Sequence, residues 1–157
     1  MIRNFLYLIS FTLILNGCSA IKTYPDNWAK NIFIISDTKS DSVMSSVKAS
    51  IDIFDVNNKC REKYIGTVQL KNKKSKIGLK NNQIIYLDFH FLTSGFFASS
   101  SSVSGLGTLI KTRNGYIYEV MASYKGNIYD VSIWEKRTKG AKGRELEFIP
   151  LHQCQRL

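Results

Sequence analysis

Apolar and polar residues alternate with a period of two through much of the chain, and this pattern most limits the folds open to it. In residues 83–92, "QIIYLDFHFL", the apolar residues Ile85, Leu87, Phe89 and Phe91 fall on one side of an extended segment. Residues 116–136 repeat the pattern with tyrosine, valine and isoleucine, which form favourable cross-strand pairs. The alternation predicts β-strands and no helix longer than two turns.

Two glycine-containing turns interrupt the second half of the alternating sequence. Asn114-Gly115 lies between two such segments and predicts a tight β-hairpin. Lys125-Gly126-Asn127 predicts a second hairpin by the same reasoning. Antiparallel neighbours joined by short turns are therefore expected in this half of the chain.

Longer polar segments are expected to be loops between the remaining strands. These are the serine-rich residues 93–107 and the basic residues 137–145. Pro150 should confine a final strand, residues 146–151, to a sheet edge because proline cannot donate a ladder hydrogen bond. The other expected strands are residues 31–36, 47–56, 63–70 and 76–79. About eight short strands predict an all-β fold, a single antiparallel β-sandwich.

The order of these pieces over residues 47–135 resembles the transthyretin-like β-sandwich modules of small bacterial lipoproteins. The similarity consists of an extended segment, a glycine-bearing turn, "IYLDFHF", a glycine-ended loop, and "GYIYEV" with a returning strand. The resemblance implies a transthyretin-like or Ig-like sandwich, and it supports the fold far more than any function.

The N-terminus has the plan of a secretory signal peptide. Arg3 precedes a mostly apolar run over residues 5–15, which is shorter than the roughly twenty residues that a bilayer span needs. The following Leu15-Asn16-Gly17-Cys18 resembles the bacterial lipobox, which implies cleavage before Cys18 and acylation of its thiol. Several acyl chains anchor a protein firmly, since each buried methylene contributes about 0.8 kcal/mol.

The expected organisation follows from this leader. Residues 1–17 are removed, residues 18–31 carry the lipid and form a short tether, and residues 32–157 form the β-sandwich domain. Ser19 follows the cysteine, and the resemblance implies outer-membrane sorting where aspartate is absent at that position. We expect an outer-membrane lipoprotein facing the periplasm, with the inner membrane and the cell surface as open alternatives.

The chain is strongly basic, with a net charge of +10. Removing the leader takes away a single basic residue, Arg3, and leaves the mature chain near +9. This charge favours an anionic envelope polymer, a membrane surface or an acidic envelope protein as partner. Nucleic acid is not expected as a partner, because an exported protein seldom meets it.

Two cysteines remain once Cys18 is assigned to lipid. Cys60 and Cys154 are expected to form a disulfide in an oxidising compartment. A metal or nucleophile pair that includes His152 stays open as an alternative, although no cysteine or histidine spacing typical of a zinc site occurs. We therefore expect neither a metal site nor a cofactor.

Two groups of side chains are candidates for binding. Clustered cations on loops can grip an anionic surface, and paired phenylalanines in a serine-rich loop can form an exposed apolar tip. We expect both basic clusters to lie at one end of the sandwich, although solvated loop lysines are the simpler interpretation. The candidates are Lys71, Lys73, Lys74 and Lys76, then Lys136, Arg137, Lys139, Lys142 and Arg144, and the Phe96/Phe97 tip.

Motifs for catalysis are scarce. No Gly-x-Ser-x-Gly elbow occurs, and Ser-x-x-Lys pairs are no more frequent than chance allows. Asp88 and His90 lie two apart on one strand face and could perform acid–base chemistry, as could Asp52 with Asp55. We expect a non-enzymatic, lipid-anchored binding or assembly module, with an inhibitor or immunity-type lipoprotein and an envelope hydrolase as alternatives.

Overall fold

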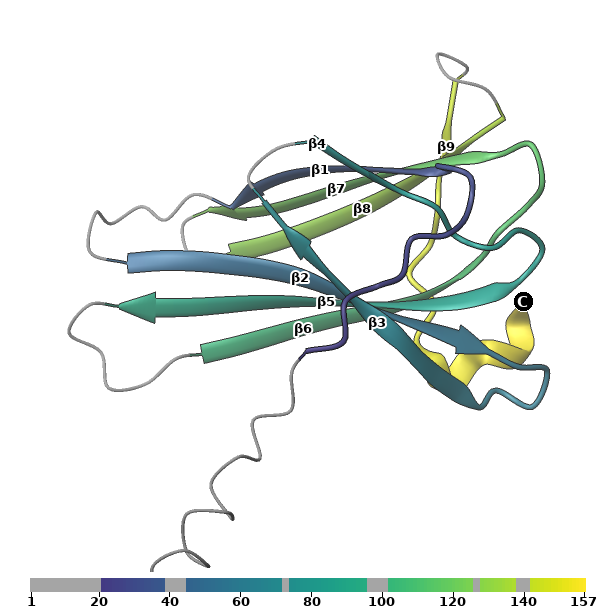
Figure 1. Cartoon of the computed structure of the whole chain (residues 1–157), viewed down its shortest axis with the longest axis horizontal. Coiled ribbons are helices and arrows are strands. Elements are labelled where there is room, and N and C mark those ends of the chain that lie inside the picture. The colour runs from purple at the N-terminus through teal and green to yellow at the C-terminus, as the bar shows by residue number, and fades with distance from the viewer. Residues whose placement is uncertain (1–20, 39–44, 72–73, 96–101, 126–127, 138–141) are drawn as a thin grey trace, which may run out of the picture.

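The computed structural model describes residues 21–38, 45–71, 74–95, 102–125, 128–137 and 142–157. Within these ranges the chain forms nine strands and a C-terminal 3-10 helix (Figure 1). The elements are β1 Ile32–Thr38, β2 Ser45–Val56, β3 Glu62–Leu70, β4 Lys74–Ile77, β5 Ile84–Gly95, β6 Ser102–Lys111, β7 Ile117–Lys125, β8 Ile128–Lys136, β9 Arg144–Glu145 and the helix Leu151–Arg156. Cys18, Phe96, Phe97, Lys73 and Lys139 lie outside the described residues.

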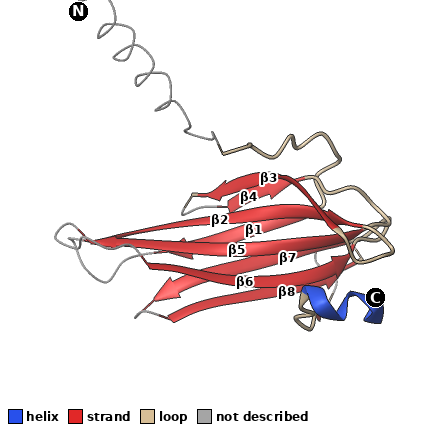
Figure 2. Cartoon of the chain, turned by 90° about the horizontal axis from the view of Figure 1, so that it is seen from below, coloured by secondary structure: helices blue, strands red, loops and turns tan. Residues whose placement is uncertain are grey.

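Two sheets pack face to face, and the predicted all-β sandwich is confirmed (Figures 1 and 2). One sheet has five strands in the order β4-β1-β7-β8-β9, and the other has four in the order β3-β2-β5-β6. Every pair of neighbours is antiparallel except β1 and β7, which run parallel. No described helix is long and apolar enough to cross a bilayer.

The core lies between the sheets and follows the alternation of the sequence. Ile85, Leu87, Phe89 and Phe91 of β5 are all at most 1% exposed, as predicted. They meet buried residues of the other sheet, among them Tyr118 of β7. The other face of β5 is half-buried, so each strand contributes one face to the core, which is how a sandwich removes apolar surface from water.

The turn at Asn114-Gly115 is not a hairpin, and that prediction is wrong. It connects β6 of one sheet to β7 of the other. Thr112 is fully buried and is held to the segment before β5: its hydroxyl donates to the Lys80 carbonyl over 2.7 Å, and its N–H donates to the Gln83 carbonyl. The next residue, Arg113, already bonds to the other sheet, since its N–H donates to the Tyr118 hydroxyl of β7 over 2.9 Å. The second predicted hairpin is confirmed, since β7 and β8 pair with Lys125 opposite Ile128; its two linking residues lie outside the described ranges.

The predicted strand over residues 146–151 is also wrong. The Leu146 N–H donates to the Ile133 carbonyl of β8, and the Leu109 N–H of β6 donates to the Ile149 carbonyl. The segment therefore crosses from the edge of one sheet to the edge of the other and cannot stay in either ladder. A 3-10 helix follows directly after Pro150.

The serine-rich segment, expected to be a loop over residues 93–107, is largely strand. β5 runs to Gly95 and β6 begins at Ser102, with Thr93 paired opposite Ser102. Cross-strand pairing thus overrides the low strand propensity of serine and glycine here.

The segment expected to be a tether is partly built into the domain. Tyr24 is buried, its N–H donates to the Thr67 carbonyl, and its hydroxyl donates to the Gly78 carbonyl over 2.7 Å. Burial, with the nearby carboxylates of Asp26 and Asp55, raises the pKa of this phenol to about 12. The chain is thus fixed to the sandwich from about Lys22 onward.

Candidate functional site

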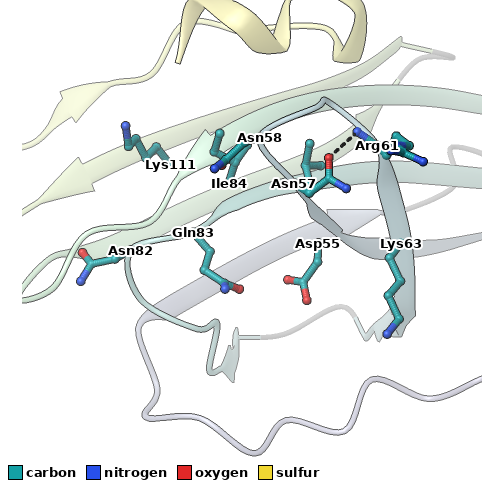
Figure 3. Close-up of a pocket in the computed structure, with 10 residues that line it drawn as sticks. Asp55, Asn57, Asn58, Arg61, Lys63, Asn82, Gln83, Ile84 and Lys111 are labelled. Atoms are coloured by element: carbon teal, nitrogen blue, oxygen red, sulfur yellow. Dashed lines mark hydrogen bonds between the residues drawn. The ribbon is translucent and has the colours of Figure 1, made fainter.

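A polar hollow lies at one end of the sandwich, beside the ends of β2, β3, β5 and β6 (Figure 3). Its volume is about 470 Å³, which falls within the usual range for small-ligand sites of roughly 300–1,000 Å³. Three short segments of the chain and one residue of β6 supply its walls. The lining residues are Asp55, Val56, Asn57, Asn58, Arg61, Lys63, Asn82, Gln83, Ile84 and Lys111.

One wall is a tight turn that the disulfide holds in place. The side-chain oxygen of Asn57 accepts hydrogen bonds from the N–H groups of Lys59 and Arg61, over 2.9 and 3.1 Å. Between them Cys60 has a positive φ of 55°, a conformation that is strained for a residue with a side chain. Cys60 is bonded to Cys154, with 5.7 Å between their Cα atoms, which confirms the predicted pairing.

The floor of the hollow places a carboxylate and an amide side chain opposite each other. Figure 3 shows the side chains of Asp55 and Gln83 directed toward one another. The Gln83 N–H donates to the Thr112 hydroxyl over 3.0 Å, which fixes its backbone. Among the side chains that the structure describes, Gln83 has a buried Oε1 without a hydrogen-bond partner. A buried acceptor without a partner is uncommon, and it indicates a position where a bound ligand could supply the missing hydrogen-bond donor.

The charge of the hollow is positive. Its lining includes three cationic residues, Arg61, Lys63 and Lys111, and a single carboxylate, that of Asp55. The Lys111 ammonium donates to the main-chain oxygen of Leu157 over 3.0 Å, and Figure 3 shows its side chain directed away from Asp55 and Gln83. The remaining polar groups are four side-chain amides, which both donate and accept hydrogen bonds. This combination suits a ligand with hydroxyl or amide groups and a negative charge.

No local sequence pattern indicates this hollow, because its walls come from separate segments. Only the run "KCREK", residues 59–63, combines a candidate disulfide cysteine with a local excess of cations. Asn82 and Lys111 come from other parts of the chain and approach this run only after β5 has paired with β2 and β6 with β5.

The two basic clusters do not meet, and their shared position at one end of the sandwich stays a prediction. The first lies along β4 and the second along β8 and β9, and β4 and β9 are opposite edges of the same sheet. Several members already have partners: the Lys76 ammonium lies 5.0 Å from the centre of the Phe33 ring, and Arg144 donates to Glu135 over 3.1 Å. The cations with described positions are Lys71, Lys74, Lys76, Lys136, Arg137, Lys142 and Arg144.

The outer face of the four-stranded sheet carries the predicted Asp88 and His90 and brings Asp52 beside them. His90 Nε2 lies 3.3 Å from Asp52 Oδ2 and 3.4 Å from Asp88 Oδ2. The Thr67 hydroxyl donates to the other oxygen of Asp52. Burial and the neighbouring Asp52 raise the pKa of Asp88, although His90 opposes the shift. Asp55, the other acid considered, belongs to the hollow.

No family model, curated protein or solved structure matches this chain. The fold and the hollow define it as a disulfide-linked β-sandwich with a small, polar, net-cationic pocket at one end.

Proposed function

We propose that this protein is a non-enzymatic binding module of the bacterial cell envelope, anchored by lipid on Cys18 and facing the periplasm. The lipobox-like Leu15–Cys18 supports the anchor, and the Cys60–Cys154 disulfide is in keeping with an oxidising compartment. Acylation can be tested by mass spectrometry of the mature N-terminus. A Cys18→Ser variant should lose the lipid and leave the membrane fraction.

The hollow is the binding site in this proposal, and its charge is the observation that carries it. Three cations and four amides around one carboxylate favour an acidic, hydroxyl- and amide-bearing ligand, such as a unit of an anionic envelope polymer. The two separated basic clusters would then contribute only to the general attraction of the protein to anionic surfaces.

A matched pair of sugars tests this proposal. N-acetylmuramic acid carries a carboxylate that N-acetylglucosamine lacks, and the two otherwise share an N-acetylated ring. The acidic sugar should shift the side-chain amide NMR signals of Asn57, Asn82 and Gln83, and its affinity should fall with added salt. Equal binding of the two sugars, or shifts confined to other parts of the protein, would contradict the proposed site.

Paired variants separate the hollow from the overall charge of the protein. An Arg61→Gln, Lys63→Gln variant should weaken binding of the acidic sugar at least tenfold. The control, Lys74→Gln and Lys76→Gln, removes the same charge from the edge strand β4 and should leave the affinity unchanged. An equal loss in both variants would show that only net charge matters.

A hydrolase is the second candidate function, and the contact of two carboxylates with one imidazole nitrogen favours it. Such a group can exchange a proton with a bound substrate. Hydrolysis of an envelope polymer that His90→Ala abolishes would support this alternative. Activity that survives the substitution would exclude His90 as the acid or base.

A further inference from the structure

The strand β6 is an edge of the four-stranded sheet, and the fold covers only one half of that edge. The Leu109 N–H donates to the Ile149 carbonyl, and the Ile149 N–H donates to the Thr108 hydroxyl over 3.0 Å. The crossing segment then turns into the 3-10 helix. Among the described residues, no backbone group outside the β5–β6 ladder bonds to the backbone of Gly105, Leu106 or Gly107.

The backbone of this uncovered half points outward at alternate residues. The Leu109 N–H is directed away from β5, because it bonds to Ile149. The β5–β6 register runs without interruption from Lys111 to Ser102, so the N–H groups of Gly107 and Gly105 are directed the same way. These groups form the hydrogen-bonding pattern that an additional strand needs.

The sequence of this edge lacks the usual protection against pairing. Residues 102–107, "SVSGLG", contain no charge and no proline, whereas the edge strand β4 carries lysines. The side chain of Leu106 packs against the main core. Tyr129 of β8 lies on the same strand face as the buried Val131 and Ile133, stacks on Phe91 of β5 with 5.5 Å between ring centres, and is 37% exposed. An added strand would find apolar contacts on its inner face.

The outer face of this edge is acidic. A Cβ atom placed on Gly105 would lie 3.7 Å from Asp88 Oδ1 and 3.8 Å from His90 Nδ1, so these atoms lie directly beside the glycine. Asp52 adds a second carboxylate, bound to the same imidazole. Because Gly105 has no side chain, a residue on the next strand, about 4.8 Å away, could reach Asp88 Oδ1. A lysine or arginine would suit that position.

We propose that the edge of β6 binds an extended segment of a partner protein by strand addition, with apolar residues facing Leu106 and a basic residue facing Asp88. A second copy of this chain fits less well. An antiparallel β6–β6 pairing centred near Gly105 would bring the acidic pairs of two copies to the same junction, and like charges across strands repel. The proposal is independent of the ligand in the hollow.

Alternating synthetic peptides of valine and lysine test this proposal, with glutamate in place of lysine as the matched control. The lysine peptide should bind the full-length domain and slow hydrogen exchange of the Gly105 and Gly107 N–H groups. Gly105→Pro removes one outward N–H without touching the β5 ladder, so it should abolish binding. Gly105→Ala keeps the N–H, and its Cβ would lie at ordinary contact distances from its neighbours, so this variant should still bind the peptide.

Three other results would overturn the proposal. The first is equal binding of the glutamate peptide, and the second is a lysine peptide that binds without protecting Gly105 and Gly107. The third is self-association, measured by ultracentrifugation, that Gly105→Pro abolishes, because it would identify a second copy of this chain as the occupant.

Asp88→Asn keeps the test valid if the proline variant does not fold. It should weaken binding of the lysine peptide about tenfold and leave the pattern of hydrogen-exchange protection unchanged.

Discussion

Breaking the Cys60–Cys154 disulfide should remove at least about a third of the free energy of unfolding of this domain. The bond joins residues 94 apart. In the chain-entropy model, closing a loop of that length restricts the unfolded chain by about 4.7 kcal/mol at 25 °C. Typical domains unfold at a cost of about 5–15 kcal/mol, so a variant with Cys60→Ser and Cys154→Ser should lie close to the limit of folding. Its Tm should fall by on the order of 10 °C.

Urea unfolding of the oxidised protein, the reduced protein and the double variant measures this effect directly. A second variant, Cys60→Gly with Cys154→Ser, separates the lost cross-link from backbone strain, since glycine adopts the positive φ of position 60 without penalty. It should recover about 1 kcal/mol relative to the serine pair. A free energy of unfolding that changes by less than about 1 kcal/mol on complete reduction would refute the loop-closure reasoning.

Three further substitutions test the packing, the buried charge and the acidic face. Gly78→Ala places a Cβ against the main-chain carbonyl of Trp28 and should destabilise the domain by about 1–3 kcal/mol in urea, whereas the same change at Gly105 should be neutral. Glu135→Gln replaces a carboxylate that is 7% exposed and bonded to Arg144, and it should cost about 1–3 kcal/mol by the same assay. For Asp88, burial and Asp52 raise the pKa above its ordinary value of 3.8 despite His90, so the folded protein binds this proton more tightly than the unfolded chain. The proton on Asp88 therefore stabilises the fold below the ordinary pKa, and this stabilisation is lost as the pH rises through the raised pKa. Asparagine carries no charge at any pH, so the urea midpoint of Asp88→Asn should exceed that of the unchanged protein by an amount that grows from pH 3 to pH 7. A gain that does not vary with pH would contradict this assignment.

The alternation in the sequence was sufficient to predict the β-sandwich and the buried face of β5. It was insufficient at Asn114-Gly115, because a turn signal describes the local backbone and not which sheet receives the next strand. There Thr112 is held by residues about thirty positions earlier, and Arg113 bonds to Tyr118 of the other sheet. The same limit applies to residues 146–151, where each end of the segment bonds to a different sheet.

Candidate sites were harder to predict than strands. Residues two apart on one strand, such as Asp88 and His90, could be placed on one face from their spacing alone. Asp52 joins them only through the β2–β5 register, in which it lies directly opposite Asp88. The hollow depends on three separated segments and on the disulfide, so no local pattern could locate it. The basic clusters looked equivalent in the sequence, but the sheet order places them on opposite edges.

The hollow and the free edge of β6 should bind their ligands independently. Lys111 lines the hollow and Gly105 lies on the free edge, six residues apart on one strand, which corresponds to about 20 Å. Between them, Thr108 and Leu109 are hydrogen-bonded to Ile149. A shift of β6 at Lys111 therefore cannot reach Gly105, or the reverse, without breaking these bonds. Saturation with N-acetylmuramic acid should therefore change the Kd of the lysine peptide less than twofold. Coupling is reciprocal, so a tenfold change in either affinity would mean about 1.4 kcal/mol transmitted along β6, which a rigid strand pinned at its middle does not allow.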